Sequence, residues 1–159
     1  MNINELIKEL GVALGLPDLQ LNPEGCARLV FDGTTAINLE VDAERGCLHL
    51  YSLLGSVPLE RRDAVLYSML KGNLFGNKTA GATLAIDSLC EEAVLCRSIE
   101  LEYLSVPRLT NILEKFVKVT ELWVKKSMKK PLLNRLGIHV GQLISFEATA
   151  GAAMAYCCQ

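Results

Sequence analysis

The residue types that carry out chemistry are present in this chain, but their spacing fits no metal or phosphate site. Its two histidines, His49 and His139, lie far apart in the sequence. A structural zinc site uses four Cys or His ligands in paired spacing, and no C-x-x-C pair occurs here. The cysteines are Cys26, Cys47, Cys90, Cys96, Cys157 and Cys158. The glycine-rich stretch 72–81 lacks the G-x-G-x-x-G and G-K-S/T patterns that cradle phosphate, so we expect no metal and no cofactor.

The candidates for acid–base or nucleophilic catalysis are equally isolated. No serine stands in a G-x-S-x-G turn. We interpret Glu91 and Glu92 as hairpin-turn residues, and Glu100 and Glu102 as solvated charges on one face of a strand. His49 lies mid-strand between leucines, where a structural or exposed histidine is the commoner case. The chain is therefore predicted not to be an enzyme; the alternative is a site assembled across a dimer from residues such as His49 and Glu100.

Composition and charge exclude further classes of protein. The chain has 159 residues, of which 50% are apolar and 21% charged, as in a folded domain and unlike a disordered chain. Residues 1–127 hold 13 Lys and Arg against 17 Asp and Glu, a net charge of −4. A protein that binds the phosphate backbone needs a basic stripe. We therefore expect no nucleic-acid partner.

The sequence also shows no signal for export or for a membrane. Residues 1–16 have no basic n-region and no uninterrupted apolar run. No stretch reaches the roughly 18–20 apolar residues that span a bilayer. Thiols without C-x-x-C spacing and without an export signal suit a reducing compartment. We expect a cytoplasmic protein with no membrane insertion.

Three segments carry the apolar periodicity of helices, and they would position the residues above. The first covers residues 3–14, and the second runs from the break at Gly55–Pro58 to about residue 74. The third covers 105–126, and its apolar stripe includes Trp123, which we predict to pack in the core.

Five segments have the pattern of strands: Cys26–Asp32, Ala36–Asp42, Cys47–Leu54, Thr83–Asp87 and Ala93–Tyr103. Apolar and polar residues alternate along the second of them, which predicts a half-buried antiparallel strand. The combined order predicts an α+β fold, α-β-β-β-α-β-β-α, with a twisted antiparallel sheet packed by helices. The third and fifth strands have more apolar surface than one layer of helices covers. Such a domain is expected to dimerise, to bind a peptide, or both.

The last 32 residues differ in composition from the rest. Pro131 is predicted to end the third helix, and Leu132–Phe146 is apolar but too interrupted by polar residues to span a membrane. We predict a domain over 1–127 and an apolar C-terminal extension over 128–159. The extension is expected to dock on apolar surface, either its own or a partner's. On its own chain it would occupy part of the groove in which a partner binds.

Four stretches, in this order, are typical of one family. They are Gly15-Leu16-Pro17 after the opening helix, the segment LQLNPEGCARLVFDGTTAINLEV at 19–41, the Gly55–Pro58 break before the second helix, and residues 81–84 before the fourth strand. With the order of elements, they resemble the class I (Tir-type) chaperones of bacterial type III secretion. The resemblance covers about residues 1–127.

The resemblance implies a cytosolic homodimer that binds the extended N-terminal segment of a secreted effector and keeps it competent for secretion without ATP. The effector would add a β-strand and seat apolar side chains in surface grooves. Components of the secretion apparatus would be further partners. The alternative is a cytosolic regulator or adaptor of the same fold that sequesters a partner protein.

Two sets of apolar residues are predicted to form the binding surfaces. Effector binding is assigned to the first helix and the first three strands, and dimerisation to the second helix and the last two strands. The effector set is Leu14, Leu16, Leu29, Phe31, Leu39 and Leu50. The dimer set is Leu66, Met69, Leu70, Leu84, Ile86 and Leu95.

Overall fold

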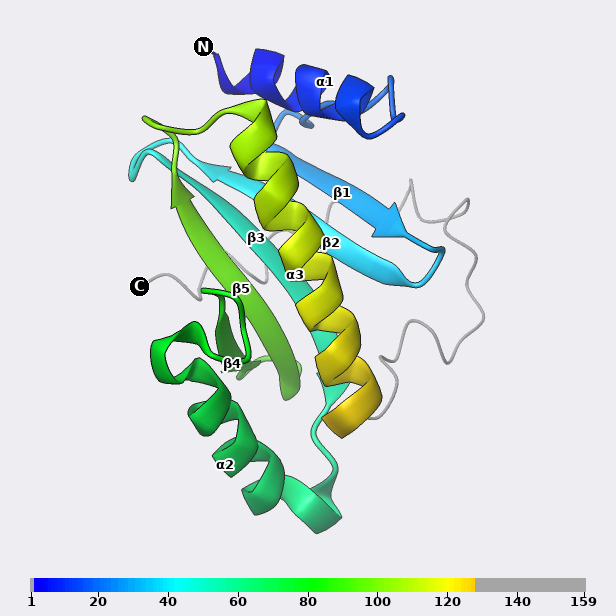
Figure 1. Cartoon of the computed structure of the whole chain (residues 1–159), viewed down its shortest axis with the longest axis vertical. Helices are drawn as coiled ribbons and strands as arrows, with labels where there is room; N and C mark the ends of the chain where they lie inside the picture. The colour runs from blue at the N-terminus through cyan, green and yellow to red at the C-terminus, as the bar shows by residue number, and fades with distance from the viewer. Residues whose placement is uncertain (1, 128–159) are drawn as a thin grey trace.

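The structure, a computed structural model, describes residues 2–127 as a five-stranded sheet with helices packed on it. The elements are α1 (Ile3–Ala13), β1 (Cys26–Phe31), β2 (Thr35–Asp42), β3 (Cys47–Ser56), η1 (Leu59–Arg61), α2 (Arg62–Asn73), η2 (Leu74–Gly76), β4 (Thr83–Asp87), β5 (Glu92–Glu100) and α3 (Val106–Ser127). In Figure 1, α3 runs along one face of the sheet, α1 crosses its end and α2 lies beside β4. The predicted α+β fold and its element order are confirmed.

The sheet is antiparallel throughout, with strand order β1-β2-β3-β5-β4. The edge strands are therefore β1 and β4. β4 is shorter than its neighbour and pairs only with residues 92–96 of β5. β3 pairs along the whole of β5, from 92 to 100. Among residues 2–127, the sheet thus has an open edge at β1 and another along the last residues of β5.

The helix-covered face of the sheet forms the core. Because successive side chains of a strand point to opposite faces, the cross-strand pairs Leu29–Ile37 and Leu39–Leu50 all lie on this face. All four residues are buried. The helices cover them with Leu6, Ile7 and Leu10 of α1, Val65 and Met69 of α2, and Leu109, Leu113 and Phe116 of α3.

Local interactions fix both ends of α1. At its start, the Asn2 side chain accepts a hydrogen bond from the N–H of Asn4 at 3.0 Å, and Glu5 accepts one from the N–H of Asn2 at 3.4 Å. This capping box satisfies N–H groups that a helix leaves unpaired. At its end, a Cβ on Gly11 would lie 2.5 Å from the carbonyl oxygen of Leu16. Only glycine lets the chain fold back this closely toward β1.

α2 and α3 meet at Trp123. Its indole is 4% exposed, and Nε1 donates to the carbonyl oxygen of Lys78 at 3.0 Å. A Cβ on Gly72 would lie 2.8 Å from the indole Cζ2, so a larger residue would push the helices apart. The prediction that Trp123 is a packing residue is confirmed, and it joins α3 to α2 as well as covering the sheet.

β5 ends earlier than predicted, at Glu100 rather than at Tyr103. The chain turns after Leu101, where the N–H of Leu104 bonds to the Leu101 carbonyl oxygen at 3.1 Å. Glu102 therefore lies in the loop that leads to α3. The prediction that Glu100 and Glu102 share a strand face was wrong.

The two carboxylates predicted for the last hairpin turn have different environments. Glu92 belongs to β5 and is buried, with Oε1 accepting from the hydroxyl of Ser56 across the ladder at 3.4 Å. Glu91 occupies the turn with a φ of 54°, and its Oε2 pairs with Nη2 of Arg62 at 3.2 Å. The description as a turn residue therefore holds for Glu91 and not for Glu92.

The predictions made for residues 128–159, namely a domain boundary after residue 127 and docking of the extension, lie outside the described residues. Within the described part of the chain, no helix is long and apolar enough to cross a membrane.

Replacing Trp123 by alanine is expected to lower the free energy of unfolding by about 3–5 kcal/mol, because the change empties a core site. Chemical denaturation followed by circular dichroism measures this. Trp123→Phe keeps a ring but loses the N–H that bonds to Lys78. Its free energy of unfolding should lie between those of the wild type and Trp123→Ala. Leu122→Ala is the matched control, since Leu122 is 65% exposed on the same helix, and should change stability by less than about 0.5 kcal/mol. An unchanged midpoint for Trp123→Ala would contradict this packing role.

Candidate partner-binding surfaces

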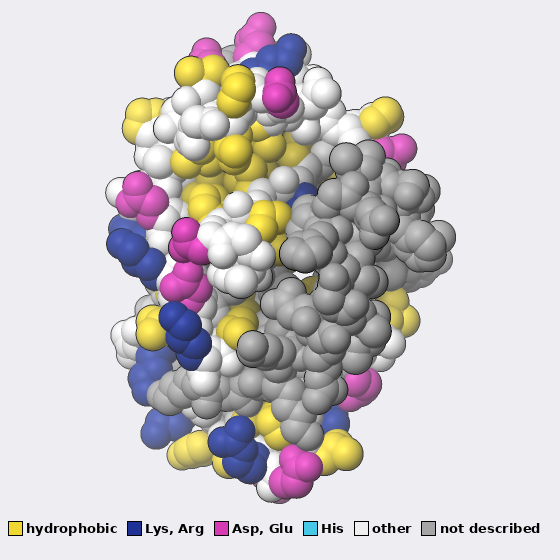
Figure 2. All heavy atoms as spheres, turned by 90° about the vertical axis from the view of Figure 1, so that its right-hand side faces the viewer, with side chains coloured by type: hydrophobic (Ala, Val, Ile, Leu, Met, Phe, Trp, Pro, Cys, Tyr) yellow, Lys and Arg dark blue, Asp and Glu magenta, His cyan; other side chains and the backbone are white. Residues whose placement is uncertain are grey.

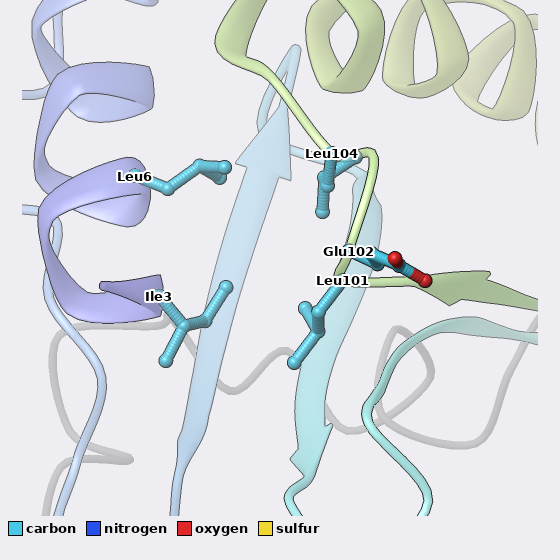
Figure 3. A pocket seen from close by; sticks show the side chains of 5 residues that line it. All are labelled: Ile3, Leu6, Leu101, Glu102 and Leu104. Carbon is cyan, nitrogen blue, oxygen red and sulfur yellow. The ribbon is translucent and has the colours of Figure 1, made fainter. Parts of the chain in front are cut away.

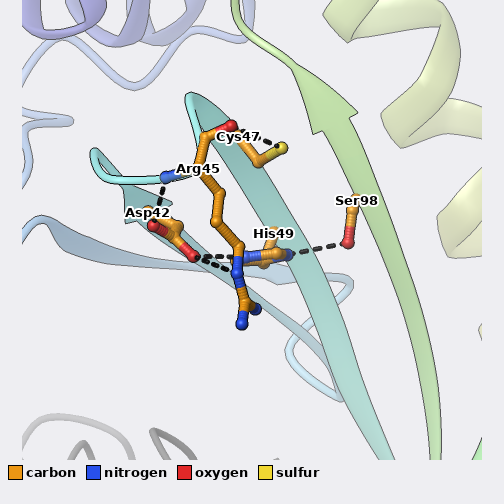
Figure 4. A network of polar contacts seen from close by, with 5 residues as sticks. All are labelled: Asp42, Arg45, Cys47, His49 and Ser98. Atoms are coloured by element: carbon orange, nitrogen blue, oxygen red, sulfur yellow. Dashed lines mark hydrogen bonds and ion pairs between the residues drawn. The ribbon is translucent and has the colours of Figure 1, made fainter. Parts of the chain in front are cut away.

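His49 belongs to a polar network that closes the β2–β3 turn (Figure 4). Its Nδ1 lies 2.8 Å from the hydroxyl of Ser98, and its Nε2 lies 3.7 Å from Oδ2 of Asp42. The N–H of Arg45 donates to Asp42 at 2.9 Å and is the largest cause that lowers the pKa of the Asp42 carboxyl. The 3.7 Å separation is too long for the hydrogen bond that orients a catalytic imidazole. These contacts support the structural role predicted for His49.

Two of the cysteine thiols on the described residues have raised pKa values. Burial is the main cause of the raised pKa of Cys26 and of Cys90. Both thiols are therefore protonated at neutral pH and are weak nucleophiles. No group of three or more His, Cys, Asp or Glu among residues 2–127 could hold a metal ion. What distinguishes the described surface is its exposed apolar side chains.

The first apolar surface lies where the helix-covered face reaches β1, and we call it the β1-side surface. Its residues are only partly buried although they pack against the core. They are Leu14 at the C-cap of α1, Ala27 and Phe31 of β1, and Val117 and Val124 of α3. Val117 and Val124 are two helical turns apart and share the flank of α3 turned away from Trp123, whose side meets α2 beside β4. β1 is at the opposite end of the sheet from β4. Figure 2 looks onto this side of the molecule and shows apolar side chains gathered below α1.

The open edge of β1 adjoins this surface. β1 bonds to β2 through alternate residues, and the Gly25 carbonyl oxygen already accepts from β2. The alternation turns the main-chain groups of Arg28 and Val30 outward. The main-chain groups of Cys26 also face outward, but both are already bonded to Asn22. The Asn22 Oδ1 accepts from the Cys26 N–H at 2.7 Å, and the Asn22 N–H donates to the Cys26 carbonyl oxygen at 2.8 Å. The open part of the edge is thus residues 28–30.

The structure divides the six residues predicted to bind the effector. Leu29, Leu39 and Leu50 are buried in the core and are not available to a partner. Leu14 and Phe31 are half-buried within the β1-side surface. Leu16, 41% exposed, lies on the loop that follows α1.

Val117 and Val124 were missed by the sequence reasoning. The apolar stripe predicted for the third helix consisted of Leu109, Ile112, Leu113, Phe116, Val119, Thr120 and Trp123, and did not include them. A signal was present, because a stripe that also includes positions 117 and 124 is wider than one contact line with the sheet requires.

The second apolar surface is the outer side of α2 with η2, and we call it the α2 face. It comprises Tyr67, Leu70, Leu74 and Phe75, all exposed. The inner side of α2 packs on β4 through Val65, Met69 and Gly72. The helix is therefore apolar on two sides, only one of which the described residues cover.

The six residues predicted for the dimer are divided in the same way. Met69, Leu84 and Leu95 are in the core, where Leu84 and Leu95 form a cross-strand pair below α2. Leu66 and Ile86 are half-buried. Leu70 is 70% exposed and belongs to the α2 face. Tyr67 and Phe75 were missed, although residues 67, 70 and 74 have helical spacing of their own.

Phe75 is 93% exposed and has an unusual backbone conformation. Its φ of 53° is in the left-handed region, which costs free energy for a residue that is not glycine. The loop that follows maintains this conformation, since the N–H of Thr79 bonds to the Gly76 carbonyl at 3.2 Å and Trp123 holds the carbonyl of Lys78. The main chain at Phe75 therefore has little freedom left to lose when a partner covers this residue.

Several solved structures share this fold. A chain in the HopA1–SchA chaperone–effector complex matches with a TM-score of 0.66 and 24% identity over 77% of this chain and 93% of that chain. A chain in the ExsC–ExsE complex matches with a TM-score of 0.66 and 24% identity, and the match covers 82% of this chain and 94% of that chain. The third structure is that of the Yersinia pestis type III secretion chaperone SycH in complex with a stable fragment of YscM2. A chain in it matches with a TM-score of 0.62 and 20% identity, and the match covers 77% of this chain and 99% of that chain.

Sequence comparison gives the family. The Chlamydia pneumoniae protein CPj0713/CpB0740 is 31% identical over 88 residues, which cover 54% of this chain and 67% of that protein. The model of the Tir chaperone protein (CesT) family matches residues 5–124, a range that runs from α1 into α3 and includes both apolar surfaces. The chain therefore belongs to the Tir chaperone protein (CesT) family.

Proposed function

We propose that this chain is a cytoplasmic type III secretion chaperone that binds the extended N-terminal segment of a secreted effector and keeps it competent for secretion. Membership of the CesT family supports the chaperone role. A relative of the same fold was solved in a chaperone–effector complex. The observation that carries the proposal is the open edge of β1 directly beside the β1-side surface.

Strand addition at β1 gives a physical basis for this binding. The outward main-chain groups of residues 28–30 would bond to a partner strand of almost any sequence, and its alternate side chains would rest on apolar residues such as Phe31. Each large apolar side chain that the partner buries contributes about 1.5–3 kcal/mol, offset by the entropy of ordering the partner. No covalent step is involved, so binding of this kind needs no ATP.

We also propose that the chain forms a homodimer through the α2 face. Small soluble proteins rarely leave a continuous apolar patch uncovered. A two-fold dimer covers the same patch on both copies. The inner stripe of α2 is occupied by its own core, so Leu70 and Phe75 remain free to meet a second copy.

Phe31→Asp and Leu16→Asp are expected to reduce capture of the effector by at least about tenfold, because an ionised carboxylate cannot be buried against an apolar partner. Co-expression pull-down of the full chain with candidate effector N-terminal segments measures this. Val30→Pro removes an outward N–H without touching the β2 ladder, and should also weaken capture.

Leu89→Asp is the control for these variants, since Leu89 is equally apolar and lies exposed at the β4–β5 turn. Circular dichroism checks that every variant is folded. If folded Phe31→Asp and Val30→Pro proteins capture the segment as wild type does, the β1-side site is wrong. If the captured protein is not secreted, the chain is a sequestering regulator instead.

The wild-type chain should sediment as a dimer at about 50 μM, well above the dissociation constants of standard-size interfaces. Leu70→Glu and Phe75→Glu place a charge in the proposed interface and should give folded monomers. Val12→Glu is the control, because Val12 is equally exposed but lies on α1. A wild-type monomer at this concentration, or dimers of both α2-face variants, would rule out the proposed interface.

A chain ending at Lys130 tests the proposal that the extension docks on apolar surface. Removing a segment that covers part of a groove should let the effector bind at least as tightly, or expose surface and cause aggregation. Binding and light scattering of the truncated and full-length chains are compared at equal concentration. Identical behaviour in both measurements would mean that the extension does not dock.

A further inference from the structure

The second open edge of the sheet lies along β5. β4 begins at Thr83, opposite Cys96, so residues 97–100 of β5 have a strand neighbour only on the β3 side among the described residues. Figure 1 shows β3 along the whole of β5 on one side, and on the other side β4 beside one end of β5 only.

Two residues of this segment direct their main-chain groups toward the open side. The N–H of Leu101 bonds to the Gly46 carbonyl oxygen, next to β3, at 2.9 Å. Main-chain groups alternate in direction along an antiparallel ladder, so those of Ile99 also face β3. Those of Ser98 and Glu100 point away from β3 and toward the open edge.

The loop before β4 contacts β5 through a side chain. Nη1 of Arg97 donates to the carbonyl oxygen of Ala80 at 2.9 Å. Gly81, with a φ of 82°, turns the chain into β4, whose first residue, Thr83, pairs with Cys96.

A pocket of about 380 Å³, lined by four aliphatic side chains and one carboxylate, lies directly beyond the edge (Figure 3). Ile3 and Leu6 of α1 point toward Leu101 and Leu104 across it, and Glu102 lies at its rim. The volume is near the lower end of the range of about 300–1,000 Å³ found for ligand pockets. The pocket is therefore large enough to admit a bulky side chain of an extended chain.

Charge at the pocket favours a cationic neighbour for that side chain. Glu100 and Glu102 are both exposed. The basic residue at this loop, Arg108, already donates through Nη1 to the carbonyl oxygen of Tyr103 at 3.0 Å. Of these two carboxylates only Glu102 lines the pocket, so a Lys or Arg at its rim would meet Glu102.

We propose that the open edge of β5 and the adjoining pocket form a second binding site, for an extended stretch of the secreted partner in which a bulky aliphatic residue stands next to Lys or Arg. The main chain of this stretch would bond to Ser98 and Glu100, its aliphatic side chain would fill the pocket, and its cation would pair with Glu102. The inference rests on the proposed function, and it adds a sequence preference and a second contact region far from β1 in the strand order.

Three labelled peptides of about ten residues, the length of a strand, test the site. Each has a Ser/Thr background, with Leu-Lys, Leu-Glu or Ser-Lys at its centre. Fluorescence polarisation with the full chain gives their affinities. The Leu-Lys peptide should bind at least about fivefold more tightly than Leu-Glu, and at least about tenfold more tightly than Ser-Lys.

The variants then locate the binding. Glu102→Lys should invert the preference to Leu-Glu, whereas the matched charge reversal Glu24→Lys, in the turn before β1, should leave it unchanged. N-methylation of those amides of the Leu-Lys peptide that would bond to Ser98 and Glu100 should abolish binding. Phe31→Asp should have no effect, because it lies on the other surface.

Equal affinity for all three peptides, or a preference that survives Glu102→Lys, would overturn the proposal. If the full chain binds none of them but a chain ending at Lys130 does, the occupant is the chain's own extension, and a partner site is also overturned. Failure here with intact capture in the pull-down leaves the proposed function standing. Peptide selectivity without any captured secreted segment would contradict the function and not the site.

Discussion

The packing of one helix across the middle of a five-stranded sheet is the constraint on which the other features depend. α3 has 22 residues and lies on the core side of β2 and β3, where Leu109, Leu113 and Phe116 are buried. A helix is about 10–12 Å wide with its side chains, whereas five strands about 4.8 Å apart span about 19 Å. α3 therefore covers the centre and leaves the margins to α1 and α2, which reach only the ends of the sheet. Half-buried apolar side chains and open edges at the margins follow from this mismatch.

The two margins differ in their chemistry. At β1, the apolar residues Phe31, Val117 and Val124 lie beside an edge of three open residues, which suits an alternating apolar partner strand. At β5, the edge leads to a pocket with a carboxylate at its rim, which suits a specific side chain. A long unfolded segment that met both margins would be held at separated points with little contact between them, and effective concentration would make the second contact stronger than it is alone.

The element order could be predicted because each segment has a clear apolar period and a clear stop. The pattern in 36–42 put Ile37, Leu39 and Val41 on one face, and they do share the helix-covered face. Alternation does not show how far a covering helix extends along that face. Leu29 and Phe31 share a face of β1, yet Leu29 is buried and Phe31 is half open, so residues of both kinds entered the predicted site. On α2, adjacent residues point about 100° apart around the helix axis. Met69 therefore faces the core, whereas Leu70 is exposed.

We propose that a secreted segment is held as an added strand at β1. Amide exchange resolved by residue in the full chain, alone and in complex with its co-purified partner, tests it most directly. The N–H groups of Arg28 and Val30 face outward in the free protein and would be hydrogen-bonded in the complex, whereas that of Leu29 is already directed to β2. Strong slowing of exchange at Arg28 and Val30 with little change at Leu29 is expected. Unchanged exchange at Arg28 and Val30 in a stable complex would contradict strand addition at this edge.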